Sequence, residues 1–108
     1  MKTHTFRKFE IYWWLSAYGD ELFRYKTSGT KDIERFSDTH YRIKAHPIGG
    51  TDDEDIEMII TCEKGQWLVK CPSFETSDAY PFASSMTQSE IVLTDAAEDE
   101  LMVIKASY

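Results

Sequence analysis

Two short segments concentrate acidic side chains, and they are the clearest place where this sequence could do chemistry. Nine carboxylates fall in two runs of six residues each, and no lysine or arginine interrupts either run. They are Asp52, Asp53, Glu54, Asp55 and Glu57 in the first run, and Asp95, Glu98, Asp99 and Glu100 in the second. Carboxylates at this density attract cations, so they suit either a solvated loop or a surface that binds a positively charged partner.

A calcium-binding loop is a third interpretation of the first run, and its spacing argues against it. An EF-hand loop spaces its acidic positions and places a glycine at its centre, whereas residues 52–55 are consecutive carboxylates. The docking interpretation is stronger than the calcium interpretation. A dense row of carboxylates can imitate the phosphates of a nucleic acid. Solvated loops and a docking surface both stay open from the sequence.

Residues that could catalyse a reaction or hold a metal are few and scattered. Cys62 and Cys71 are offset by four residues in the hairpin predicted below, about 13 Å, and a disulfide needs Cα atoms within about 7 Å. His40 and His46 are six residues apart on one predicted strand, about 20 Å. The sequence contains no glycine-rich phosphate loop, nucleophile elbow or zinc-protease helix. We therefore expect free thiols, no enzyme activity, no metal and no cofactor.

A run of aromatic residues gives a second candidate surface. Alternate side chains of a strand point to opposite faces, so Trp13 and Trp14 cannot both enter one core. Either a helix covers the second face, or Tyr12 and Trp14 form an exposed patch suited to a protein interface. Tyr12 and Trp14 therefore join the acidic residues as candidate partner-binding residues.

Charge is distributed unevenly along the 108 residues, whose formal net charge is −7. Residues 1–48 hold nine basic and six acidic residues, whereas residues 49–108 hold three basic and thirteen acidic ones. This balance argues against direct nucleic-acid binding, which requires a dominant basic face.

The length of the chain favours a single domain, 1–108. No apolar run is suited to a signal peptide or a membrane span, so we expect a cytoplasmic protein without a membrane partner.

Alternating apolar residues predict strands over most of the chain. The expected strands are 9–17, 22–27, 41–46, 56–63, 66–71, 90–94 and 101–107. A two-residue turn at Lys64-Gly65 joins the fourth and fifth of these strands, 56–63 and 66–71. Its register pairs Cys62 with Trp67, Ile60 with Val69 and Met58 with Cys71, which places six apolar side chains on one face.

Two segments lack the strand pattern and are expected to contain short helices. Thr30 can cap a helix over 31–37, with Ile33 and Phe36 three residues apart on its buried side. The segment 72–89 is long enough to contain another. The predicted fold class is α+β: an antiparallel β-sheet built from consecutive hairpins, with one or two short helices packed on one face.

Together these features favour a small acidic, non-catalytic inhibitor that binds a basic protein, such as a nucleic-acid-binding enzyme or complex. An anti-CRISPR or anti-restriction protein of a phage or mobile element fits, as does an immunity protein against a toxic nuclease, and either could imitate nucleic-acid charge. A structural or assembly protein of a virion or secretion system is the alternative. A small enzyme or ligand carrier is the third, and would require a deep apolar pocket. A homodimer is compatible with all of them.

Overall fold

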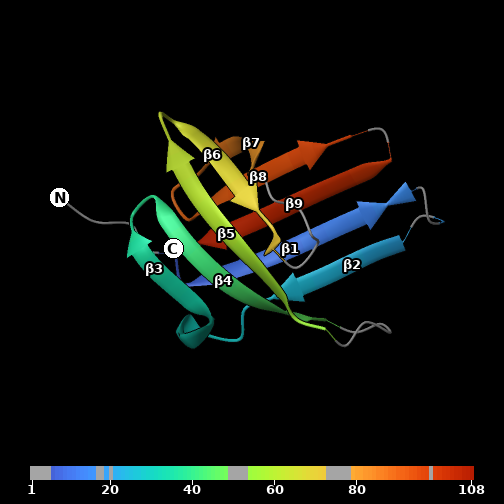
Figure 1. Cartoon of the computed structure of the whole chain (residues 1–108), viewed down its shortest axis with the longest axis horizontal. Helices are drawn as coiled ribbons and strands as arrows, with labels where there is room; N and C mark the ends of the chain where they lie inside the picture. Colours follow the sequence, from blue (N-terminus) through green and yellow to red (C-terminus); the bar gives the residue numbers. More distant parts are fainter. Residues whose placement is uncertain (1–5, 17–18, 20, 49–53, 73–78, 98) are drawn as a thin grey trace.

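Nine β-strands form most of the chain that the computed structural model describes, which is residues 6–16, 19, 21–48, 54–72, 79–97 and 99–108 (Figure 1). The strands are β1 (Lys8–Leu15), β2 (Glu21–Lys26), β3 (Ile33–Ser37), β4 (His40–Pro47), β5 (Ile56–Glu63), β6 (Gln66–Lys70), β7 (Tyr80–Met86), β8 (Glu90–Ala96) and β9 (Glu100–Ser107). A 3₁₀ turn, η2, covers Thr30–Asp32. No helix in the described ranges has the length and apolar character needed to span a membrane.

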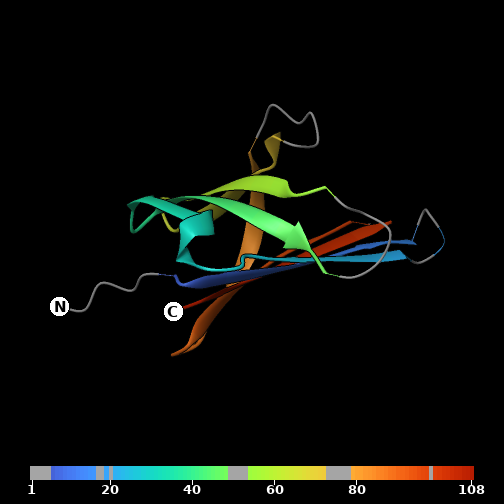
Figure 2. The same cartoon turned by 90° about the horizontal axis from the view of Figure 1, so that it is seen from below.

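Hydrogen bonding closes eight of these strands into an antiparallel barrel. The strands pair in the order β2-β1-β9-β8-β7-β6-β5-β4-β3, and a further pairing of β2 with β4 completes the ring. That pairing joins Tyr25 to Pro47 and Lys26 to His46, while β3 pairs with the first half of β4. Figure 2 shows that the barrel is flattened: β4 and β5 form one layer, β1, β2 and β9 form the other, and β7 crosses between them.

The predicted α+β class is wrong, because the described residues contain no helix that packs on the sheet. The segment predicted as a helix, 31–37, contains only the end of η2 and then becomes β3, in which Ile33 pairs with Ile43 and Glu34 with Arg42. The edge of β4 offers this segment a row of backbone hydrogen bonds, which outweighs a weak helical spacing of two apolar residues. Phe36, expected on a buried helix face, is 55% exposed.

The prediction of a second helix within 72–89 is also wrong for the described part of that segment, which forms a strand. Tyr80–Met86 form β7, whose two halves have different partners. Residues 80–82 pair with β6, and residues 83–86 pair with β8. Pro81 interrupts the alternation of apolar residues that predicts a strand, and for that reason the sequence pattern missed this one.

The prediction for the hairpin of β5 and β6 is confirmed in its turn and its register. Lys64 and Gly65 have φ angles of 52° and 78°, the left-handed conformation that a type I′ turn requires at both positions. Cys62 pairs with Trp67 and Ile60 with Val69, as expected. β6 ends at Lys70, one residue before the third expected pair, which would join Met58 to Cys71.

Alternate residues of the strands point into the barrel and form one core. β1 contributes Phe9 and Ile11, β4 contributes Tyr41, Ile43 and Ala45, and the remaining strands continue this inner layer with Tyr25, Ile56, Met58, Ile60, Trp67, Val69, Phe82, Ile91, Leu93, Met102, Ile104 and Ala106. A packed barrel interior of this kind needs no covering helix, because the ring of strands buries its own apolar face.

One end of the barrel is filled by an aromatic cluster, and we call it the closed end. Phe6, just before β1, lies at the centre of this cluster. Its ring centroid is 5.0 Å from that of Tyr41, 5.1 Å from that of Tyr108 and 5.6 Å from that of Phe9. Trp67 completes the cluster at 6.1 Å from Phe6. Tyr41 and Trp67 lie near the starts of β4 and β6, and Tyr108 follows β9, so the cluster seals this end.

A candidate binding site at the open end of the barrel

Four connections leave the barrel at the end opposite the aromatic cluster, which we call the open end. They join β1 to β2, β4 to β5, β6 to β7 and β8 to β9, because successive strands of this antiparallel barrel alternate in direction. These connections, 16–20, 48–55, 71–79 and 97–99, contain one, four, two and two carboxylates and no lysine or arginine. The turns 38–39, 64–65 and 87–89 at the closed end contain a single carboxylate, Asp38, and the remaining connection, 27–32 between β2 and β3, contains Asp32 and Lys31. The topology therefore brings the described residues of both acidic runs to the ends of strands on one side of the barrel: Glu54, Asp55 and Glu57 from the first run, and Asp95, Asp99 and Glu100 from the second.

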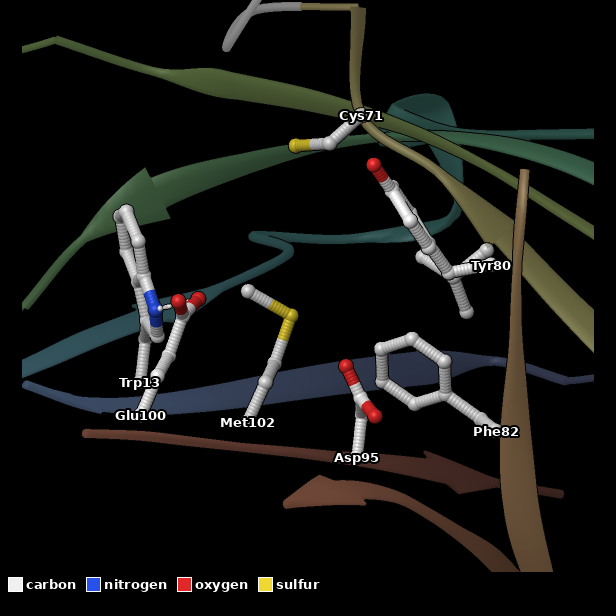
Figure 3. A pocket seen from close by; sticks show the side chains of 8 residues that line it. Trp13, Cys71, Tyr80, Phe82, Asp95, Glu100 and Met102 are labelled. Atoms are coloured by element: carbon white, nitrogen blue, oxygen red, sulfur yellow. Dashed lines mark hydrogen bonds between the residues drawn. The ribbon is translucent and has the colours of Figure 1, made fainter. Parts of the chain in front are cut away.

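A cavity of about 410 Å³ opens between the two layers at this end (Figure 3). Four of its lining side chains come from the layer of β1, β8 and β9, and the others come from β6, β7 and the residue after β6. The lining residues are Trp13, Val69, Cys71, Tyr80, Phe82, Asp95, Glu100 and Met102. This lining is apolar and aromatic except for two carboxylates, and it includes no basic side chain among the described residues.

The cavity exists because β7 leaves β8 part of the way along its length. Ala83–Thr94 is the last pair between these strands, and from Phe82 backwards β7 pairs with β6 alone. The two layers therefore separate here, and the ends of β8 and β9 are not covered by β7. Figure 3 shows the result: Asp95, Met102 and Glu100 lie along the floor, Tyr80 and Phe82 form a side wall, and Cys71 lies above.

Strand alternation aims the two carboxylates into this space. Asp95 follows Leu93 at a two-residue interval on β8, and Glu100 precedes Met102 at the same interval on β9; Leu93 and Met102 are both buried. Asp95 and Glu100 themselves are exposed, because the cavity is open to solvent at its mouth. They are therefore inward-facing groups that a ligand could reach.

Glu100 is held in place by an aromatic neighbour. The indole Nε1 of Trp13 donates a hydrogen bond of 2.6 Å to Oε1 of Glu100. The ring of Trp13 in turn packs against Phe23, at 5.8 Å between centroids. This contact occupies one oxygen of Glu100 and fixes the direction of the other, so the carboxylate is oriented before any ligand arrives.

The first acidic run is neutralised to a large extent within the protein. Glu57 forms an ion pair with Arg42 at 2.9 Å, and Asp55 lies 3.8 Å from Nζ of Lys44. Glu54 is exposed just before β5, and Asp52 and Asp53 lie outside the described residues. In the second run, the described carboxylates Asp95, Asp99 and Glu100 are all exposed, and Glu98 lies outside the described residues. The second run therefore presents more of its described carboxylates to a partner than the first run does.

His46 links the first run to the segment before β3. Its Nδ1 is 2.8 Å from Oδ1 of Asp55 and its Nε2 is 2.9 Å from Oδ2 of Asp32. Hydrogen bonds to Asp55 and Asp32 raise the pKa of His46 above its usual value of 6.5. Hydrogen bonds from the hydroxyl and the backbone N–H of Ser28 lower the pKa of Asp32 from 3.8 to about 2. The charged pairs therefore fasten η2 to the start of β5.

Tyr12 and Trp14 point outward from β1, as the alternation predicts, and both are half-buried. The Tyr12 hydroxyl donates to Oε2 of Glu10 at 3.2 Å, and the ammonium of Lys105 lies 5.4 Å from the centre of the Tyr12 ring. Trp14 pairs across the sheet with Leu22 on β2 and Leu101 on β9. Neighbouring strands, rather than a helix, thus cover part of these rings.

Among the described residues, no group of three or more His, Cys, Asp or Glu side chains could hold a metal ion. Cys62 and Cys71 are both free thiols, as the hairpin register predicts. Cys71 lies in the cavity wall, and its Sγ is 3.4 Å from the backbone oxygen of Glu57.

The sequence pattern did not predict the cavity or the histidine bridge. The sequence nevertheless contains a signal for the inward position of Asp95 and Glu100. Asp95 falls two residues after Leu93, and Glu100 falls two residues before Met102, so both occupy the alternate positions that hold the apolar residues of their strands. Extending those strands to the acidic residues would have shown both carboxylates on the inner face. The contact of His46 with Asp32 joins residues of β4 and η2, and no local pattern encodes it.

Comparison of this chain with protein-family models, with curated proteins and with solved structures gives no match.

Proposed function

We propose that this protein is a non-catalytic binding protein that docks a basic protein partner at the open end of its barrel. One observation carries the proposal: Asp95 and Glu100 line the cavity at that end, and no described lysine or arginine lines it. A third described carboxylate, Asp99, is exposed between them in the chain. A concave surface of one charge sign concentrates the field and favours a partner of the opposite sign.

The second acidic run is the main docking element in this proposal. Asp95, Asp99 and Glu100 are exposed, and Asp95 and Glu100 line the cavity, whereas Asp55 and Glu57 already have cationic neighbours in Lys44, His46 and Arg42. A carboxylate with an internal ion pair gains less from a new cation, because part of its field is already compensated. We expect the first run to steer the partner and the second run to contact it.

The partner most compatible with such a surface is a protein with a Lys- and Arg-rich groove, such as a nucleic-acid-binding enzyme or complex. The carboxylates would take the place of phosphates there, and the protein would inhibit by occupying the groove. An anti-CRISPR or anti-restriction factor of a phage, or an immunity protein, acting in the cytoplasm of its source or host, is the biological form that we propose.

A direct test uses a peptide of alternating arginine and glycine, labelled for fluorescence anisotropy. We expect binding that weakens steeply between about 0.1 M and 1 M salt, as the Debye length falls from about 10 Å to about 3 Å. The double variant Glu98→Gln/Asp99→Asn should weaken binding several-fold, mainly through slower association. The control Glu34→Gln/Glu63→Gln removes the same charge outside the four open-end connections and should bind like the wild type. Equal effects of the two double variants, or binding insensitive to salt, would contradict the proposal.

The cavity itself favours a second candidate function, the carriage of a small molecule. Its volume of about 410 Å³ falls within the range of roughly 300–1,000 Å³ that is usual for small-molecule sites, and most of its lining is apolar or aromatic. A carrier of this kind would bind a neutral aromatic probe such as naphthylmethanol with an affinity that salt does not change. The peptide and the neutral probe therefore separate the two functions.

A further inference from the structure

We infer that the cavity at the open end binds the side chain of an arginine supplied by the partner protein. This inference rests on the proposed function and adds to it the residue that the partner must insert. The cavity combines the two features that a guanidinium group on an aliphatic stem requires: carboxylates on one side and aromatic or apolar walls on the others.

Asp95 pairs with Met102 across β8 and β9, and Glu100 is two residues from Met102 on the same face, so the two carboxylates are diagonal neighbours on the sheet. Figure 3 shows Asp95 and Glu100 on the floor of the cavity, on either side of Met102. Trp13 holds one oxygen of Glu100, which leaves the second oxygen and both oxygens of Asp95 as acceptors for a ligand. A guanidinium group carries five N–H donors in a planar fork, so it can reach two carboxylates at once.

The walls suit the remainder of an arginine side chain. Phe82 and Met102 are almost completely buried, at 5% and 8% exposure, and they present an apolar surface along the inner part of the cavity. Tyr80, at the mouth, is 51% exposed and lies with its ring along the side wall. The methylene groups of the stem would cover apolar surface, and the planar head would stack on an aromatic ring near the solvent.

Arginine fits this site better than lysine for two physical reasons. A guanidinium group is more weakly hydrated than an ammonium group, so it loses less on entering a partly enclosed site. It also stacks face to face on an aromatic ring while donating in its own plane, which an ammonium group cannot do. The site offers aromatic rings and carboxylates together, which is the combination that uses both properties.

The test compares a peptide with one central arginine, a peptide with citrulline in its place, and a peptide with lysine. Citrulline is the neutral isostere of arginine, so the comparison isolates the charge. The readouts are the indole proton signal of Trp13 and the methyl signal of Met102 in NMR titrations of the full chain. We expect the arginine peptide to shift both signals, and the citrulline peptide to shift neither at the same concentration.

The variants Asp95→Asn and Glu100→Gln should each lower the affinity of the arginine peptide by about tenfold or more, since each removes a hydrogen bond between charged groups. Gln at position 100 can still accept from the Trp13 indole, so the local fold is kept. Asp99→Asn is the matched comparison, because it removes an exposed carboxylate of the same end that does not line the cavity. It should weaken the arginine peptide clearly less than either cavity variant, since Asp99 would act only through longer-range charge.

Each outcome decides the inference. If the arginine peptide binds but leaves the Trp13 and Met102 signals unmoved, or if all three variants weaken it equally, the cavity assignment is wrong and the proposed docking function stands. If the citrulline peptide or the lysine peptide binds as tightly as the arginine peptide, the assignment of arginine is also wrong. If the alternating arginine–glycine peptide fails to bind the wild type at all, the proposed function fails, and this inference fails with it.

Discussion

The two ends of this barrel use aromatic side chains in opposite ways. At the closed end, Phe6 and Tyr41 are 4% and 0% exposed and lie within a cluster of rings that fills the space between the layers. At the open end, Trp13 and Tyr80 line a cavity that two carboxylates share, and Tyr80 is half exposed. The same residue types therefore stabilise one end and leave the other available for binding. Stability and recognition should respond to substitutions at different ends.

The largest expected effect is a loss of stability at the closed end. Phe6→Ala should lower the free energy of unfolding by about 3–5 kcal/mol, because it removes the ring at the centre of the aromatic cluster. Tyr80→Ala at the open end is the matched truncation and should cost less than about 1 kcal/mol, since that ring is 51% exposed. Urea unfolding of both variants measures the difference. Similar losses for the two would erase the distinction between the ends.

The middle of the barrel should behave like the closed end. Ile60 is 1% exposed and pairs with Val69 and Tyr41 on neighbouring strands, so Ile60→Ala should cost about 2–5 kcal/mol. Ile59, its neighbour in the chain, points to the other face of the sheet and is only partly buried. Ile59→Ala should therefore cost clearly less in the same unfolding experiment. The reverse order would show that the register of β5 is wrong.

The histidine bridge predicts how stability depends on pH. The pKa of His46 is raised by Asp55 and Asp32, so its stabilising contribution is complete below the unfolded pKa of about 6.5 and is lost as the pH rises through the folded value. The pKa of Asp32 is lowered to about 2, so its contribution is complete above 3.8 and is lost as the pH falls toward 2. Thermal unfolding from pH 4 to pH 9 should show a decline on the alkaline side. His46→Gln should remove that decline, and an unchanged profile in this variant would assign it to other groups.

The smallest expected effect concerns an ion pair of the first acidic run. Arg42 and Glu57 are each about half exposed, so the pair is screened by water. Glu57→Gln should change stability by less than about 1 kcal/mol. It should also leave the peptide affinity nearly unchanged, because Glu57 is already compensated by Arg42. A loss of affinity equal to that of Asp95→Asn would show that the first run contacts the partner directly.

Much of the strand content could be predicted from the sequence, because alternation is a local signal. The strands around Ile11, Ile43, Ile60 and Ile104 all carry it, and the turn at Lys64-Gly65 fixed one register. The helix expected over 31–37 was wrong because the free edge of β4, and not the segment itself, decides its conformation. Closure through two pairs between β2 and β4 is also a long-range event that no local pattern encodes.

The candidate site, like the fold, could be predicted only in part from the sequence. The sequence indicated Asp95, Asp99 and Glu100 as candidate binding residues, but it could not show that Asp95 and Glu100 share a cavity with Trp13 and Tyr80. That arrangement depends on the point at which β7 leaves β8, which is a property of two strands and their partners together. Equally, the sequence could not show that Asp55 and Glu57 would meet Lys44 and Arg42, because those contacts follow from the register of β4 and β5.

We expect the open end of the barrel to bind cations and the closed end not to bind them. The most direct test follows the backbone amide signals of the full chain during titration with the alternating arginine–glycine peptide at about 0.1 M salt. We predict that the largest shifts fall at the open end, at Ser16, in 95–97 and 99–101, and in the indole of Trp13. The turns at 64–65 and 87–89, together with Tyr108, should stay unmoved. Shifts that spread evenly over both ends, or that centre on the closed end, would contradict the account.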